Sequence, residues 1–279
     1  MPVYIIAVML CAALLHATWN AIVKSGSNKL YESAINCFGG GLTVLFLLPF
    51  LPLPAAESLP FLMGSCITHI FYYLSLTMAY RNVDMSYAYT LMRGTAPLLT
   101  SLFLLCTGVP LAPSGWLGVF CLCSGVLVLA LDHIRQGRFS ARGTLAAFCT
   151  ACVIMTYTLF DGFGARASGS PVSYTVWLYI VNIFPLNLYV LLRERRDFIP
   201  YFKERWKIGV FGGACGFGSY GVALWAMTKA PIAMVAALRE TSVIFGMLLA
   251  VLFLGERFTF TKLLAVVMVA ASTMLMKMQ

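Results

Sequence analysis

Long apolar stretches, separated by short polar connections, run through the whole chain. A stretch of about 17–25 apolar residues is what an α-helix needs to cross a lipid bilayer. The pattern predicts ten membrane-spanning helices at 3–23, 33–51, 59–80, 85–107, 114–131, 143–163, 172–192, 207–227, 231–254 and 260–276. The connections at 132–143 and 193–207 are longer and basic, but too short for a soluble domain. An all-α integral membrane protein is therefore expected.

Composition supports this class and excludes others. The chain is 61% hydrophobic and 10% charged, whereas soluble domains carry about 25% charged residues. The formal net charge is +9, but the basic residues lie in short connections, where membrane topology and anionic lipid explain them without nucleic acid. The nine cysteines lie in apolar segments and lack zinc-site spacing, so we expect packing roles, with no metal and no cofactor.

An internal repeat divides the chain into two halves. A shift of 147 residues pairs Thr95 with Ser242, and a shift of 138 pairs Trp19 with Tyr157. Five spans are an odd number, so the second half must insert upside down, as in many secondary transporters. We expect two inverted five-helix repeats around a central cavity, with the first repeat at 1–133, a basic linker at 134–142 and the second repeat at 143–279.

The basic residues of the connections gather on one side of this arrangement. Because successive spans cross the membrane in opposite directions, fourteen lysines and arginines outside the spans fall on one face of the membrane and three on the other. Because positively charged loops stay inside, we expect a multi-pass protein of the cell (inner) membrane with both termini on the outer, periplasmic side.

Ionisable residues occur near the middle of two spans. Arg239 and Glu240 lie within 231–254, and Arg93 is the ninth residue of 85–107. A charge at this depth costs about 2.5–3.5 kcal/mol on insertion scales and usually marks a transport pathway. We expect both arginines to line the cavity, with Glu240 as partner of Arg93 and a substrate carboxylate or phosphate on Arg239. Alternatively, a buried Arg93–Glu240 pair only fixes the register of the halves.

Polar and aromatic residues on other spans complete the predicted site. The substrate-binding candidates are Arg93, Arg239, Glu240, Trp19, Asn20, His16, Tyr73, Tyr89 and Tyr157. Trp19 either stacks on a substrate or packs in the core. Glu240, His69 and Asp161 are candidates for proton coupling; the alternatives are a buried, hydrogen-bonded His69 and an Asp161 that is merely a charge at a helix end. Pro97 should kink the helix beside Arg93.

Two segments resemble a known family of transporters. "LLHATWNAIVK" at 14–24 and "ALWAMTKAPIAMVAALRETSVIFGMLLAVLFLGER" at 223–257 are similar to the EamA family of the drug/metabolite transporter superfamily. The resemblance implies ten helices, a central cavity between the halves, and transport without ATP, mostly export or exchange of small metabolites such as amino acids. The first half departs from the family pattern, because Gly108-Val109 stands where "GE" is expected. No substrate role is therefore assigned to Glu256.

These patterns favour a secondary active transporter, an exporter or exchanger of a small anionic or zwitterionic metabolite working by alternating access. Its partners are the substrate, the bilayer, and protons or a counter-transported solute. A multidrug or lipophilic-cation efflux carrier is the alternative, but it needs an intramembrane carboxylate without competing arginines. An integral membrane transferase needs paired catalytic groups, and only Asp132-His133 is adjacent, so we expect no enzyme and no catalytic residues. A receptor or assembly factor would not need buried charges facing a cavity.

Overall fold

The computed structural model describes residues 2–82, 85–109, 111–135, 140–254 and 260–277. In this part of the chain all regular secondary structure is helical. The elements are α1 (Val3–Ser25), α2 (Lys29–Leu45), η1 (Leu48–Phe50), η2 (Ala56–Ser58), α3 (Leu59–Asn82), α4 (Met85–Cys106), α5 (Pro113–Arg135), α6 (Ala141–Ala167), α7 (Pro171–Arg193), α8 (Arg195–Met227), α9 (Ile232–Arg239), α10 (Ser242–Leu254) and α11 (Phe260–Lys277).

Six stretches of the described helices are long and apolar enough to cross a bilayer. They are Val3–Val23, Lys29–Phe50, Ala56–Leu76, Ala141–Ala167, Pro171–Arg193 and Arg195–Met227. Two further apolar helices, Leu91–Cys106 and Pro113–Val128, are shorter. The chain is thus a multi-pass membrane protein. Helices lie at the positions of the predicted spans, but their bounds differ. The predicted span 33–51 is divided, because α2 ends at Leu45 and the short helix η1 follows at Leu48–Phe50.

The segment 193–207 was predicted to be a connection, and this is wrong, because α8 already begins at Arg195. Its apolar side chains recur at helical spacing and pack against α2. The rings of Phe198 and Tyr201 lie 5.4 and 5.5 Å from the ring of Tyr31, measured between centroids. Charged residues dominate the composition of this segment, but its amphipathic face is what determines the local structure.

The predicted span 231–254 is broken in the middle. Helix α9 ends at Arg239 and α10 begins at Ser242. Between them the backbone makes i→i−3 hydrogen bonds, from Glu240 N to the Ala237 carbonyl (2.9 Å) and from Thr241 N to that of Leu238 (3.1 Å). The Thr241 hydroxyl donates to the same Leu238 carbonyl, at 2.7 Å, and thereby competes with regular helix bonding. A tightened turn inside a helix often marks a functional hinge.

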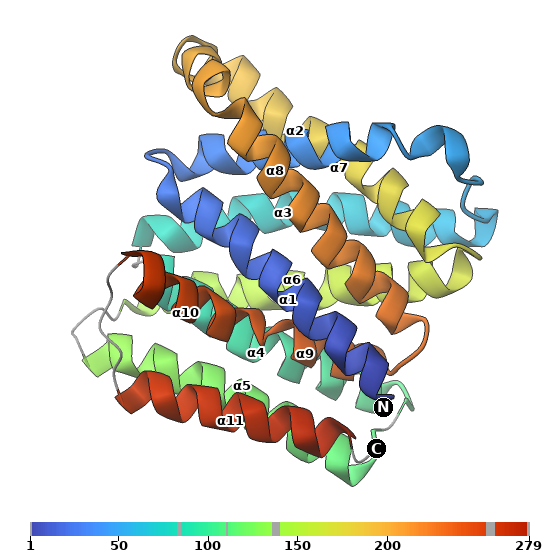
Figure 1. Ribbon diagram of the computed structural model, residues 1–279, viewed down its shortest axis with the longest axis vertical. Helices are drawn as coiled ribbons and strands as arrows, with labels where there is room; N and C mark the ends of the chain where they lie inside the picture. Colours follow the sequence, from blue (N-terminus) through green and yellow to red (C-terminus); the bar gives the residue numbers. More distant parts are fainter. Residues whose placement is uncertain (1, 83–84, 110, 136–139, 255–259, 278–279) are drawn as a thin grey trace.

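Helices from the two halves of the chain interleave (Figure 1). α1 packs on α8, α3 on α6, and α5 on α11, while the start of α1 and the end of α11 lie at the same end of the bundle (Figure 1). The α2–α8 contact is close because glycines face each other. A Cβ atom on Gly213 would lie 2.1 Å from the backbone nitrogen of Gly40. Around the expected linker 134–142, α5 runs on to Arg135 and α6 begins at Ala141.

Candidate functional site

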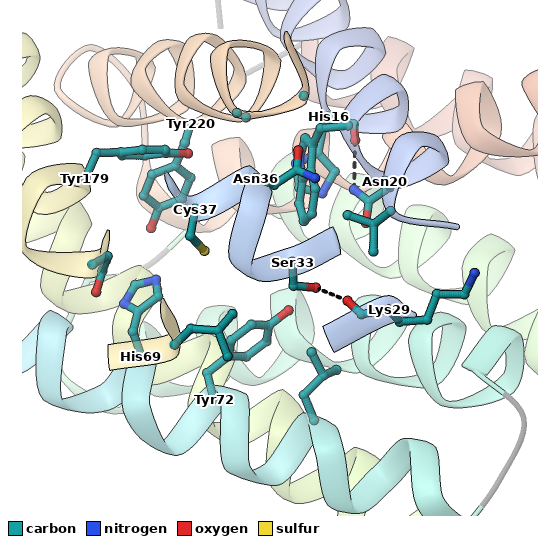
Figure 2. A pocket seen from close by; sticks show the side chains of 18 of the residues that line it. His16, Asn20, Lys29, Ser33, Asn36, Cys37, His69, Tyr72, Tyr179 and Tyr220 are labelled. Atoms are coloured by element: carbon teal, nitrogen blue, oxygen red, sulfur yellow. Dashed lines mark hydrogen bonds between the residues drawn. The ribbon is translucent and has the colours of Figure 1, made fainter. Parts of the chain in front are cut away.

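A cavity of about 450 Å³ lies between the two halves of the chain. Figure 2 shows His69 and Tyr72 reaching into it from α3, with Tyr179 and Tyr220 on the opposite wall. Helices α1, α2, α3, α4, α6, α7, α8 and α9 all contribute lining residues, among them His16, Trp19, Asn20, Asn36, His69, Tyr72, Arg93, Tyr157, Tyr179, Asn182, Tyr220 and Arg239. A volume in this range is typical of small-molecule sites.

The charged groups that line this cavity are all basic. Lys29, Arg93 and Arg239 line it, together with the imidazoles of His16 and His69. No aspartate or glutamate belongs to the lining in the described part of the chain. Charged walls of one sign in a low-dielectric surrounding strengthen the electrostatic field inside a cavity. The basic lining therefore favours an anionic ligand.

Arg93 is held by partners within the protein. Its Nη1 donates to Oε1 of Glu240 at 3.1 Å, and both side chains are buried. Its Nη2 contacts Nε2 of His16, while the indole nitrogen of Trp19 lies 3.2 Å from Nδ1 of the same imidazole. A neutral imidazole has one acceptor nitrogen, so His16 accepts from Arg93 or from Trp19, but not from both.

Arg239 is the contrasting case. It is the last residue of α9, and it is 3% exposed. Its Nε and Nη1 are buried and have no hydrogen-bond partner among the described residues. Its guanidinium carbon lies 5.3 Å from the centroid of the Tyr220 ring, a cation–π arrangement. Buried donors normally find acceptors, so these two N–H groups are available to an acceptor from outside the described residues.

Asp161 lies behind the cavity wall and is fully buried. It accepts a hydrogen bond from the Tyr174 hydroxyl at 3.0 Å and another from the Tyr220 hydroxyl. The interpretation of Asp161 as a charge at a helix end is wrong, because α6 continues to Ala167. The turn that follows the predicted span limit is polar and glycine-rich, and for this reason its helical character was missed.

The other predicted residues are placed as follows. Asn20 lines the cavity and donates to the His16 carbonyl at 2.7 Å, as Figure 2 shows. The rings of His69 and Tyr157 stack with centroids 4.5 Å apart, and both line the cavity. The side chains of Tyr73 and Tyr89 lie outside the described residues, as do those of Asp132 and His133.

Sequence reasoning missed several lining residues. The Oδ1 atoms of Asn36 and Asn182 are buried, without a hydrogen-bond partner in the described chain, and both residues line the cavity. Tyr220 was missed too, although the 147-residue shift pairs it with Tyr73. Lone asparagines inside apolar spans were the available signal for the first two.

The cavity extends to one end of the bundle. Its lining includes Asn28 and Lys29 at the α1–α2 connection, next to Val23 and Leu76. A second cavity, of about 220 Å³, is lined by residues at the ends of α4 and α6 and the start of α9. There Arg166 donates to the Met227 carbonyl (2.7 Å) and the Ala230 carbonyl (2.9 Å), tying α6 to the end of α8.

Comparisons with known proteins agree with this arrangement. A model described as the EamA-like transporter family matches residues 141–278, from the start of α6 through α11. No curated protein sequence matches. A solved structure, described only as a crystal structure of a protein, is similar over 100% of this chain and 98% of its own, with a TM-score of 0.75 and 17% sequence identity. At that identity the likeness shows a shared fold.

Proposed function

The chain belongs to the EamA-like transporter family, and from that premise we propose that it is a secondary active transporter, an exporter or exchanger, for a small anionic or zwitterionic metabolite. One observation carries the choice of substrate. In the wall of the central cavity, Arg239 presents two buried N–H donors that have no partner among the described residues. A carboxylate, phosphate or phosphonate supplies the acceptor oxygens that these donors need.

The two arginines have different roles in this proposal. Glu240 compensates the charge of Arg93 at 3.1 Å, so that pair holds α4 against the broken helix α9–α10. This structural role is the alternative that the sequence left open for Arg93. The charge of Arg239 has no such compensation from an ion pair in the described chain, and it therefore serves as the anion-binding group.

The remainder of the cavity fits the other end of a zwitterion. The Oδ1 atoms of Asn36 and Asn182, which lack a partner in the described part of the chain, can accept hydrogen bonds from an ammonium or hydroxyl group. The rings of Tyr72, Tyr157 and Tyr179 enclose the space between. An amino acid, which carries both charges, has the chemistry that these groups would bind. Lipophilic cations fit less well, because no carboxylate lines the described cavity.

Inverted repeats explain how such a site could alternate between the two sides. Residues close to a pseudo-two-fold axis contact the equivalent residues of the other repeat. Two contacts of this kind join residues that are 147 positions apart in the sequence. These are Arg93 with Glu240, and the Cys121 thiol with the Met268 carbonyl at 3.3 Å. The α1–α8 contact is also mirrored by α6–α3, and α4–α6 by α10–α1. We infer that 1–133 rocks against 143–279 around the midplane site.

Orientation follows from the loop charges. With both termini outside, the basic α1–α2 connection lies in the cytoplasm. The cavity reaches Asn28 and Lys29 in that connection, so the conformation described here is the cytoplasm-facing one. On the outer side, the contacts of Arg166 with the end of α8 close the bundle.

A ligand screen followed by transport tests the proposal. Binding to the folded state raises the melting temperature with ligand concentration, so purified protein is first melted against amino acids, organic phosphates and phosphonates. Compounds that stabilise the wild type are then assayed for counterflow in proteoliposomes. Arg239→Gln should abolish both signals, while Arg142→Gln, which removes an exposed charge at the start of α6, should leave both intact. Retained counterflow in a folded Arg239→Gln protein would contradict the proposal.

A further inference from the structure

Asp161 is a buried carboxylate that the proposed transport cycle does not yet use. Its side chain is fully buried, and it accepts hydrogen bonds from the hydroxyls of Tyr174, Tyr220 and Ser65. In the described chain no lysine, arginine or histidine forms an ion pair with it. An ionised carboxylate without a cation is unfavourable in such a place, whereas hydroxyl groups can accommodate either the charged or the protonated form.

Tyr220 connects this carboxylate to the substrate site. Its hydroxyl donates to Asp161, its ring lies beneath the guanidinium of Arg239, and it lines the cavity. The other titratable groups around Asp161 come from the elements packed against it. They are Cys66 and His69 on α3, Tyr174 and Tyr179 on α7, Tyr220 on α8 and, beyond that ring, Arg239 on α9. The Tyr220 side chain thus lies between the Arg239 guanidinium and the Asp161 carboxylate and contacts both.

We propose that Asp161 is a proton-binding site, and that its charge state controls how strongly Arg239 holds the anionic group of the substrate. On deprotonation the proton passes from the carboxyl group by way of the Tyr220 hydroxyl to water in the cavity, and a carboxylate remains. The carboxylate attracts Arg239 and competes with the substrate anion, whereas the neutral acid does not. The link to substrate rests on the proposed function; the proton site itself does not.

The expected coupling follows from the distances. The Arg239 carbon lies 5.3 Å from the centroid of the Tyr220 ring, and the hydroxyl of that ring reaches Asp161, so the two charges are at most about 11 Å apart. At the effective dielectric constant of about 20 that suits buried sites, this interaction changes affinity about tenfold. By linkage, substrate and proton affinity change by the same factor. Proton and anion therefore bind cooperatively.

Infrared spectroscopy of the purified protein tests the proton site without any ligand. A protonated carboxyl group has a C=O stretching band that vanishes on ionisation. Titrated between about pH 4 and about pH 9, the wild type should show such a band that depends on pH, and Asp161→Asn should lack it. Identical titrations of the two proteins would overturn the proton site.

Arg239→Gln imitates the neutralisation of Arg239 by a bound anion and tests the coupling. Removing this charge should move the midpoint of the Asp161 band upward by about one pH unit, the tenfold effect calculated above. Arg142→Gln is the matched control, because Arg142 lies in the first turn of the same helix, about 28 Å from Asp161 along the helix axis. In this variant the midpoint of the Asp161 band should not move. Equal midpoints in all three proteins would refute the coupling. If Asp161→Asn does not fold, Tyr174→Phe identifies the Asp161 band, because the loss of a hydrogen bond to this carboxylate should move its midpoint upward and leave that of Glu240 in place. An unmoved band in Tyr174→Phe would overturn its assignment to Asp161.

Discussion

Removing Glu240 should destabilise the protein far more than removing a surface charge. Glu240→Gln leaves Arg93 charged and without its carboxylate partner. Arg93 and Glu240 are 5% and 2% exposed, and their atoms are 3.1 Å apart, so water cannot compensate the loss. Breaking one side of a buried ion pair costs about 3–5 kcal/mol. At about 2 °C per kcal/mol for a chain of this size, the melting temperature should fall by about 6–10 °C.

A double-mutant cycle separates pairing from packing. Replacing both residues, as Arg93→Met with Glu240→Met, should recover most of the stability, because apolar pairs often substitute for buried ion pairs without loss. Melting curves of the wild type, Arg93→Met, Glu240→Met and the double variant, recorded in one detergent, give the interaction energy of the pair directly. If the two single losses simply add in the double variant, Arg93 and Glu240 are not coupled, and the structural role given to Arg93 is wrong.

The other predictions use the same melting and binding assays. Arg239→Gln should melt at or above the wild-type temperature, because it removes a buried charge whose Nε and Nη1 have no partner in the described chain; a large fall would show that Arg239 is structural. Gly213→Ala should destabilise the fold strongly, since the new Cβ would lie 2.1 Å from the Gly40 nitrogen. Gly216→Ala, one turn later, should be tolerated, because the nearest atom to its Cβ would be the Tyr179 hydroxyl at 3.6 Å; equal melting temperatures of the two variants would contradict the close α2–α8 packing. Asn182→Ala should weaken binding of zwitterions about tenfold but leave simple carboxylates unaffected, because its buried Oδ1 is assigned to the ammonium end.

Much of the helical fold could be predicted from the sequence, since a bilayer imposes both length and apolarity on every span. The two errors in helix boundaries have different causes. Helix α8 begins at Arg195 because Phe198 and Tyr201 pack on Tyr31, a contact distant in sequence. The break after Arg239 depends on a threonine hydroxyl bonding to the backbone, and a threonine inside an apolar run carries no unambiguous signal for that.

The candidate site was predictable only where charge made it conspicuous. The contact between Arg93 and Glu240 was expected because both charges lie deep in predicted spans and need compensation, and the structure contains it. The unequal pairing of the two arginines could not be foreseen, because it depends on which neighbour reaches each guanidinium. Asn36 and Asn182 were overlooked, since one amide in an apolar helix equally suits packing between helices.

An experimental structure with a bound substrate from the ligand screen tests the role of Arg239 most directly. The anionic group of that compound should accept a hydrogen bond from Nε or Nη1 of Arg239, at about 2.7–2.9 Å, with Arg93 still paired to Glu240. A substrate whose anionic group lies on Arg93, with Arg239 directed away from it, would contradict the assignment of the two arginines.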